Sequence, residues 1–204
     1  LLMQAHSQWL ARLPAAQAQA PEQAVVEHEF AHLNGMLVQL LGLYKLGVNQ
    51  LPMCPDYHDL DDFIGALLAS NQPIIDSREI IARYEVDAFS PLGFFDRELV
   101  GSVISNVINN AIRYAGHALL ITVSEEGEQL VLSVNDDGPG YPQVMIDRQA
   151  DYVQGINLHT GSTGLGLYFA ERIAALHERD GIRGRIEIAN GGALGGGLFR
   201  LYLP

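Results

Sequence analysis

The chain has 204 residues, of which 48% are hydrophobic and 18% charged, and 24 acidic against 12 basic residues give it a formal net charge of −12. This composition supports a packed core and excludes wholesale disorder. The negative charge argues against binding to nucleic acid or to an anionic membrane surface. The single cysteine, Cys54, excludes an intrachain disulfide and a zinc site made of cysteines.

The start of the chain carries no targeting signal. It opens with LLMQ rather than an initiator methionine, and no basic segment or cleavage site follows. No apolar run reaches the roughly 18 residues that a membrane-spanning helix needs. We therefore interpret the chain as a fragment of a longer protein, beginning with a helical stub and linker over residues 1–20.

The next segment has the apolar spacing of a packed helix. From Pro21 onward, apolar residues alternate at intervals of four and three: Val26, Phe30, Leu33, Leu37, Leu40 and Tyr44. A second helical run begins near Asp56, and Pro73 is expected to kink or interrupt it. The two helices, joined by the turn-rich LPMCPD, predict an antiparallel hairpin over residues 21–87 that dimerises into a four-helix bundle.

The second half mixes helices and strands. We expect a helix over 96–114, strands over 118–124 and 130–135, a helix over 164–177, and strands over 185–189 and 198–203. This order is typical of a two-layer α/β sandwich, here over residues 88–204. The predicted fold class of the whole chain is therefore α+β, with the domain boundary near residues 84–92.

Three motifs follow one another in the second half. Asn106 and Asn110 lie four residues apart, which places both amides on one face of a helix. Asp136 ends an apolar strand and opens the sequence DDGPG, where glycines let the backbone approach a ligand. The sequence GSTGLGL over residues 161–167 runs into an apolar helix, whose first N–H groups suit a phosphate.

Together, from about Glu98 to Pro204, these motifs resemble the GHKL ATPases. That nucleotide fold is shared by sensor histidine kinases, type II topoisomerases, mismatch-repair ATPases and the 90-kDa heat-shock chaperones. The P-loop pattern is absent from the sequence, which excludes a P-loop NTPase. The resemblance implies that the chain binds ATP and Mg²⁺.

The resemblance also assigns roles to individual residues. It implies that Asn110 ligates Mg²⁺, that Asn106 and Arg113 support the phosphates, and that Tyr114 packs on the adenine. Asp136 would accept a hydrogen bond from the adenine amino group, with the backbone close to the base at Gly138 and Gly140. The phosphates would be cradled by Thr163, Gly164, Leu165 and Gly166, and residues 141–160 would form the ATP lid.

The sequence EHEFAHLN over residues 27–34 resembles the histidine-phosphotransfer domain of sensor histidine kinases. His28 points away from the apolar seam, on what we take as the first helix of the hairpin. The resemblance implies that His28 is the phosphoacceptor and that Glu29 acts as its general base or orients its ring. The proline of the common His-Glu-x-x-x-Pro pattern is absent, and His32, one turn later, is a competing acceptor.

The leading hypothesis is a sensor histidine kinase core from the bacterial cytoplasm, with any membrane anchor outside the fragment. It would form a homodimer through the hairpin, phosphorylate its own histidine, and pass the phosphoryl group to an aspartate of a response-regulator receiver domain. The alternative is a non-catalytic histidine phosphotransferase or a pseudokinase with a degenerate GHKL domain. Topoisomerase and mismatch-repair fragments are disfavoured because no transducer domain follows the last strand.

Overall fold

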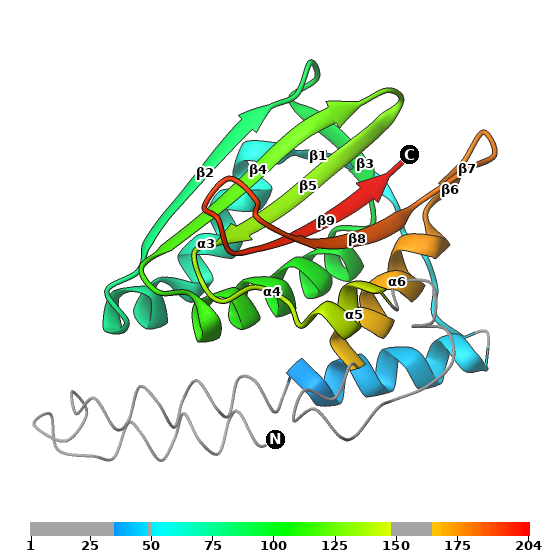
Figure 1. Cartoon of the computed structure of the whole chain (residues 1–204). Helices are drawn as coiled ribbons and strands as arrows, with labels where there is room; N and C mark the ends of the chain where they lie inside the picture. Colours follow the sequence, from blue (N-terminus) through cyan, green and yellow to red (C-terminus); the bar gives the residue numbers. More distant parts are fainter. Residues whose placement is uncertain (1–34, 49, 148–164) are drawn as a thin grey trace, which may run out of the picture.

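The computed structural model describes residues 35–48, 50–147 and 165–204. Its centre is a five-stranded sheet with the strand order β2-β4-β5-β9-β8 (Figure 1). The strands are β2 (Ile81–Asp87), β4 (Ala118–Glu126), β5 (Gln129–Asp136), β8 (Arg185–Asn190) and β9 (Gly197–Leu203). β2 runs parallel to β4, and the other neighbouring pairs are antiparallel.

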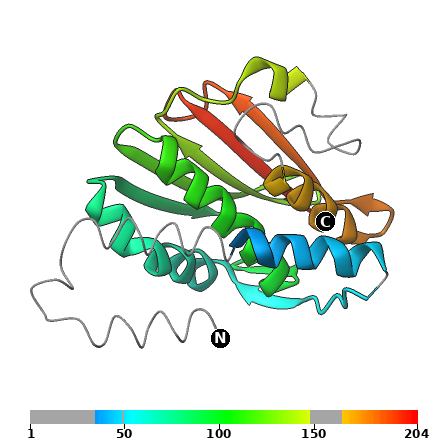
Figure 2. The ribbon, with the colours of Figure 1, turned by 90° about the horizontal axis from the view of Figure 1, so that it is seen from below.

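Helices cover one face of this sheet (Figure 2). They are α3 (Leu60–Ser77), α4 (Arg97–Tyr114) and α6 (Leu165–Leu176), and the short α5 (Gln143–Asp147) follows the end of β5. Side chains alternate along β4, so that Leu119, Ile121 and Val123 are buried against the helices. The predicted two-layer α/β sandwich is confirmed, and its expected helices and strands lie within a few residues of the observed ones.

Two short antiparallel ribbons flank the sheet. β1 (Asp56–Asp59) pairs with β3 (Leu92–Phe95), and β6 (Glu178–Arg179) pairs with β7 (Ile182–Arg183). Neither ribbon was expected from the sequence, because each strand is too short to show alternation.

The expected second helix of the hairpin lies in the α/β domain instead. α3 packs on α4 and β2, and its residues Leu60, Phe63 and Ile64 are at most 2% exposed within the same core as the sheet. The boundary placed near residues 84–92 is wrong, because it would detach β2 from β4. Pro73 does not interrupt α3, since Ile75 beyond it is buried and keeps the last turn on the core.

Residues 35–47, before this domain, form a helix that packs on α6 with one face. Gln39 is 3% exposed, and a Cβ at Gly42 would lie 2.9 Å from Phe169 Cε2. The expected seam residues Leu37, Leu40 and Tyr44 lie on exposed surface. The N-terminal part of the expected hairpin, including the segment 1–20, lies outside the described residues.

A buried polar junction joins three parts of the chain. Asp96 caps α4 by accepting from the N–H groups of Glu98 and Leu99, and its Oδ2 accepts from the Cys54 N–H at 2.8 Å. The Asp96 N–H donates to Nε2 of His177 at 3.1 Å, while Nδ1 lies 2.9 Å from the Ile173 carbonyl. His177 is thus held as the neutral tautomer that donates from Nδ1. Burial lowers its pKa from 6.5, although the Ile173 hydrogen bond and the Asp96 charge oppose that shift.

This junction predicts a pH dependence of stability. The pKa of His177 is lower in the folded than in the unfolded chain, so the unfolded chain binds the extra proton as the pH falls below 6.5. The stabilisation is therefore complete above that value and is lost on acidification. In denaturant titrations between about pH 7 and about pH 5, the free energy of unfolding should fall more steeply for the wild type than for His177→Gln. His117→Gln, at an exposed histidine, should keep the wild-type slope, and equal slopes in all three proteins would contradict the assignment.

Candidate functional site

α4 presents the two predicted asparagines beside its buried face. Its apolar residues point into the core, and Asn106 and Asn110 are half-buried. Arg113 and Tyr114 occupy the last turn and are exposed, and Arg78 Nη1 lies 3.5 Å from the Arg113 carbonyl oxygen. The helix thus offers amide groups along its middle and a cation with an aromatic ring at its end.

Both glycine motifs come into contact with this helix. A Cβ at Gly166 would lie 2.4 Å from Asn106 Nδ2, and a Cβ at Gly138 would lie 2.3 Å from the Tyr114 carbonyl oxygen. Asn106 and Tyr114 are eight residues apart, or about 12 Å along the helix. Asn110 lies midway between these contacts, so α4 connects the two predicted halves of the site.

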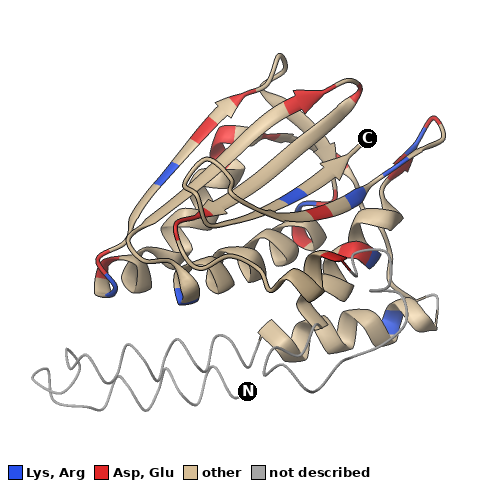
Figure 3. Cartoon of the chain, viewed as in Figure 1, with Lys and Arg blue, Asp and Glu red and all other residues tan. Residues whose placement is uncertain are grey.

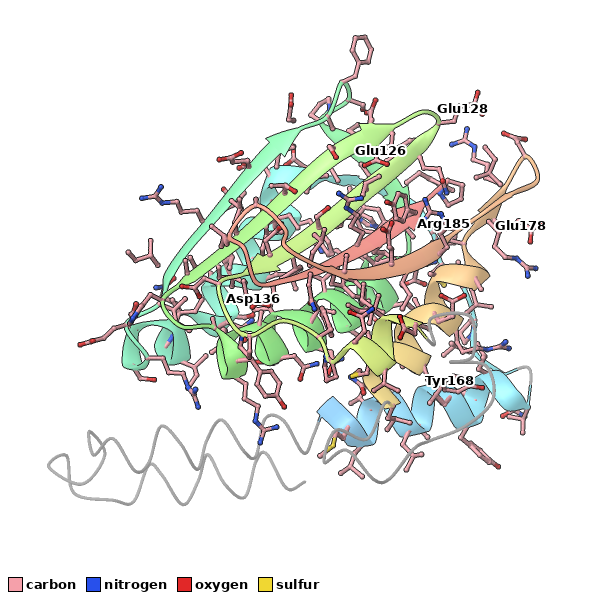
Figure 4. All side chains as sticks on the ribbon, in the orientation of Figure 1. Glu126, Glu128, Asp136, Tyr168, Glu178 and Arg185 are labelled. Atoms are coloured by element: carbon pink, nitrogen blue, oxygen red, sulfur yellow. The ribbon has the colours of Figure 1, made fainter. Side chains whose placement is uncertain are left out.

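Asp136 has a fixed carboxylate. Its Oδ1 accepts from the N–H groups of Gly138 at 2.8 Å and Gly197 at 3.2 Å. Figure 4 places Asp136 where β5 ends above α4, away from Glu126 and Glu128 at the other end of that hairpin. The site therefore has a carboxylate oriented by backbone groups.

The neighbouring Asp137 was not among the predicted site residues. Its carboxylate accepts from the N–H groups of Gly116 at 2.8 Å, His117 at 2.9 Å and Ala118 at 3.0 Å, the turn that joins α4 to β4. Burial alone would raise the pKa of Asp137, but these backbone donors outweigh it and lower the pKa below its usual value. The signal was present in the sequence, because adjacent residues of a strand point to opposite faces and two successive aspartates therefore have different partners.

The turn between β8 and β9 forms hydrogen bonds with the end of β5. The Gly196 N–H donates to the Asp136 carbonyl at 3.1 Å, and a Cβ at Gly196 would lie 2.5 Å from that oxygen. The Ala193 N–H donates to Asn135 Oδ1 at 3.0 Å. Gly192 and Gly196 are therefore required by the close approach of this turn to the end of β5, since a Cβ at either would lie 2.5 Å from an oxygen of Asn135 or Asp136.

Other predicted residues are placed as follows. Leu165 and Gly166 are the first two residues of α6, and Gly140 has a φ of +78° just after the Asp136 turn. Of the expected lid, residues 141–147 are described and include α5. Five predicted residues lie outside the described residues: Thr163, Gly164, His28, Glu29 and His32.

Acidic positions outnumber basic ones along the described part of the chain (Figure 3). Arg113 is the one basic side chain among the predicted site residues. Across residues 35–48, 50–147 and 165–204, no three His, Cys, Asp or Glu side chains gather as a metal site. A metal at this site would depend on the amide of Asn110 and on the ligand's own oxygens. No helix in the same ranges is long and apolar enough to cross a bilayer.

Comparisons with known proteins give a consistent result. Residues 95–204 match the family described as histidine kinase-, DNA gyrase B- and HSP90-like ATPase. The sensor-like histidine kinase SenX3 of Mycobacterium tuberculosis is 28% identical over 158 residues, covering 74% of this chain and 38% of SenX3. The chain thus spans well under half of that relative.

Solved structures support the fold. The Acinetobacter baumannii histidine kinase AdeS superimposes with a TM-score of 0.65 at 21% identity, covering 95% of both chains. Full-length ShkA in complex with AMPPNP gives a TM-score of 0.68 at 23% identity, covering 85% of this chain and 36% of that one. The resemblance to sensor histidine kinases noted in the sequence is confirmed, and with it the GHKL-type ATPase fold.

The contact at Gly138 predicts a stability effect. Gly138→Ala would push a methyl group into the Tyr114 backbone carbonyl, which cannot rotate away, so we expect the free energy of unfolding to fall by about 1–3 kcal/mol. Gly47→Ala is the matched control, because nothing lies within 4 Å of its Cβ position. Thermal and denaturant unfolding would measure both variants. An unchanged stability of Gly138→Ala would contradict the close approach of the two segments.

Proposed function

The chain belongs to the histidine kinase-, DNA gyrase B- and HSP90-like ATPase family, and from this premise we propose that it is the kinase core of a sensor histidine kinase. The observation that carries the proposal is the convergence on α4, where Asn106 contacts Gly166 and the Tyr114 carbonyl contacts Gly138. Family membership implies ATP binding, and this convergence supports one continuous nucleotide site.

The residues of the site fit the nucleotide. Asp136, held by two backbone N–H groups, would accept from the adenine amino group, and Tyr114 would cover the base. Gly138 and Gly140 carry no side chain, so a ligand beside them would meet main-chain atoms of the turn. At the other end, the N-terminus of α6 at Leu165 and Gly166 would meet the phosphates, together with Thr163 and Gly164.

Charge neutralisation would come from few protein groups. Asn110, between the two glycine contacts, would supply an amide oxygen to Mg²⁺, with Asn106 and Arg113 toward the phosphates. When bound, Mg²⁺ would offset the negative charge of the phosphates, which an acidic chain otherwise repels. We therefore expect nucleotide affinity to depend strongly on Asn110.

His28 is the proposed acceptor. A ring nitrogen would form a bond to the γ-phosphorus as the bond to the β,γ-bridging oxygen breaks, releasing ADP, while Glu29 takes or orients the ring proton. The phosphoryl group would then pass to an aspartate of a receiver domain. Since α3 lies in the α/β domain, it is not the hairpin partner of the segment around His28, and within this chain such a partner would have to come from residues 1–20.

Dimerisation is the second part of the proposal. Leu37, Leu40 and Tyr44 are 58%, 55% and 67% exposed, which leaves one apolar face of the segment 35–47 for another helix. We propose a homodimer through this face, on the cytoplasmic side of a bacterial membrane that other parts of the full protein would reach.

Autophosphorylation tests the proposal. With γ-labelled ATP and Mg²⁺, the wild type should acquire an acid-labile label, and His28→Ala and Asn110→Ala should each lose it, by at least about a hundredfold. Asn110→Ala should also weaken nucleotide binding, whereas His28→Ala should bind as the wild type does. His32→Ala is the matched control for the acceptor and should keep the label.

Three outcomes would contradict parts of this scheme. A label that survives in His28→Ala and disappears in His32→Ala would move the acceptor by one turn. Nucleotide binding without any label would contradict assigning the acceptor to this chain. Absence of both would favour the alternative, a non-catalytic phosphotransferase or pseudokinase.

A further inference from the structure

The side chain of Asn190 forms two hydrogen bonds with one backbone residue far away in sequence. Its Oδ1 accepts from the Tyr141 N–H at 2.7 Å, and its Nδ2 donates to the Tyr141 carbonyl oxygen at 2.8 Å. Asn190 is the last residue of β8, and Tyr141 follows the glycine turn that starts at Asp136. The amide thus acts as a neighbouring strand would, and it fixes the path of the chain as it leaves the site.

Gly140 makes this contact possible. A Cβ there would lie 2.4 Å from Asn190 Oδ1, and its φ of +78° is one that residues with a side chain rarely adopt. The sequence resemblance implies one role for Gly140, which is to let the backbone approach the base. The structure shows a second and independent role, because only a residue without a side chain leaves room for the Asn190 amide.

The other end of the same turn holds Asp136. Asn190 and Gly197 are paired across β8 and β9, and Gly197 donates its N–H to Asp136 Oδ1. A Cβ at Gly197 would also lie 3.4 Å from Tyr141 Cε2. The paired residues Asn190 and Gly197 therefore hold both ends of the glycine turn by hydrogen bonds, Gly197 at Asp136 and Asn190 at Tyr141.

We propose that Asn190 is a positioning residue of the nucleotide site, which acts through Tyr141 to hold the turn 136–141 in the shape that binds the adenine side of the nucleotide. This inference rests on the proposed function, because it requires that Asp136 contacts the base. Its effect falls on nucleotide affinity rather than on the transfer step, since Asn190 contacts the backbone of the turn and not the reacting atoms.

The test is equilibrium binding of AMPPNP with Mg²⁺ to the full chain. Losing both hydrogen bonds in Asn190→Ala should weaken binding about tenfold, and should raise KM for ATP while kcat stays within about twofold. The matched control is Gln50→Ala, which removes an exposed amide side chain between the helical segment 35–47 and β1, and it should bind as the wild type does.

Asn190→Asp adds a second measurement, the pH dependence of AMPPNP affinity, which should not change if Asn190 has only a structural role. Its introduced carboxylate can accept from the Tyr141 N–H but repels the Tyr141 carbonyl, whereas its protonated form can donate to that oxygen. AMPPNP affinity should therefore be weak at neutral pH and recover relative to the wild type as the pH falls through the pKa of the new group. This variant also serves if Asn190→Ala does not fold.

The outcomes separate this inference from the proposed function. Wild-type affinity in both Asn190 variants, or a lowered melting temperature with unchanged affinity and no pH-dependent recovery, would overturn the role of Asn190. If the wild type binds AMPPNP but acquires no label, the kinase proposal fails while the Asn190 comparison still decides this inference. If the wild type does not bind AMPPNP at all, both fail.

Discussion

Two adjacent carboxylates at the end of β5 hold the candidate site together by accepting backbone N–H groups in different directions. Asp136 accepts from Gly138 and Gly197, and Asp137 accepts from Gly116, His117 and Ala118. These bonds join the end of β5 to the β8–β9 turn and to the turn after α4. Charge-assisted bonds of this kind are stronger than neutral ones, and they orient a carboxylate before any ligand arrives. The glycines around Asp136 follow from the same constraint, because the surrounding chain segments approach too closely for side chains.

The second constraint is the packing of α3 in the core of the α/β domain. The short connection after the helical segment 35–47 leads directly to β1, and within this connection Cys54 donates its N–H to the buried Asp96. The same helical segment packs on α6 through the contact of Gly42 with Phe169, and the first turn of α6 holds Gly166, which meets Asn106. The helical segment 35–47 is thus attached to the α/β domain both through the chain and through packing.

The site operates in an acidic protein with little positive charge of its own. The net charge is −12, and Arg113 is the one cation among the predicted site residues. In the proposed scheme a triphosphate would therefore depend on main-chain N–H groups, on amides and on a bound cation rather than on a cluster of lysines and arginines.

The sequence by itself determined the ATPase fold and most of the nucleotide motifs. Asn106, Asn110, Asp136 and the glycines stand out because their spacing on helix and strand ends is local, and local spacing can be read without a partner. Tertiary structure alone decided that α3 joins the sheet rather than a hairpin, since an amphipathic helix shows which face is apolar but not which surface covers it. It also decided the hydrogen-bond partners of Asp137, Asn190 and His177, because these partners lie distant in the chain and come together only when the sheet forms.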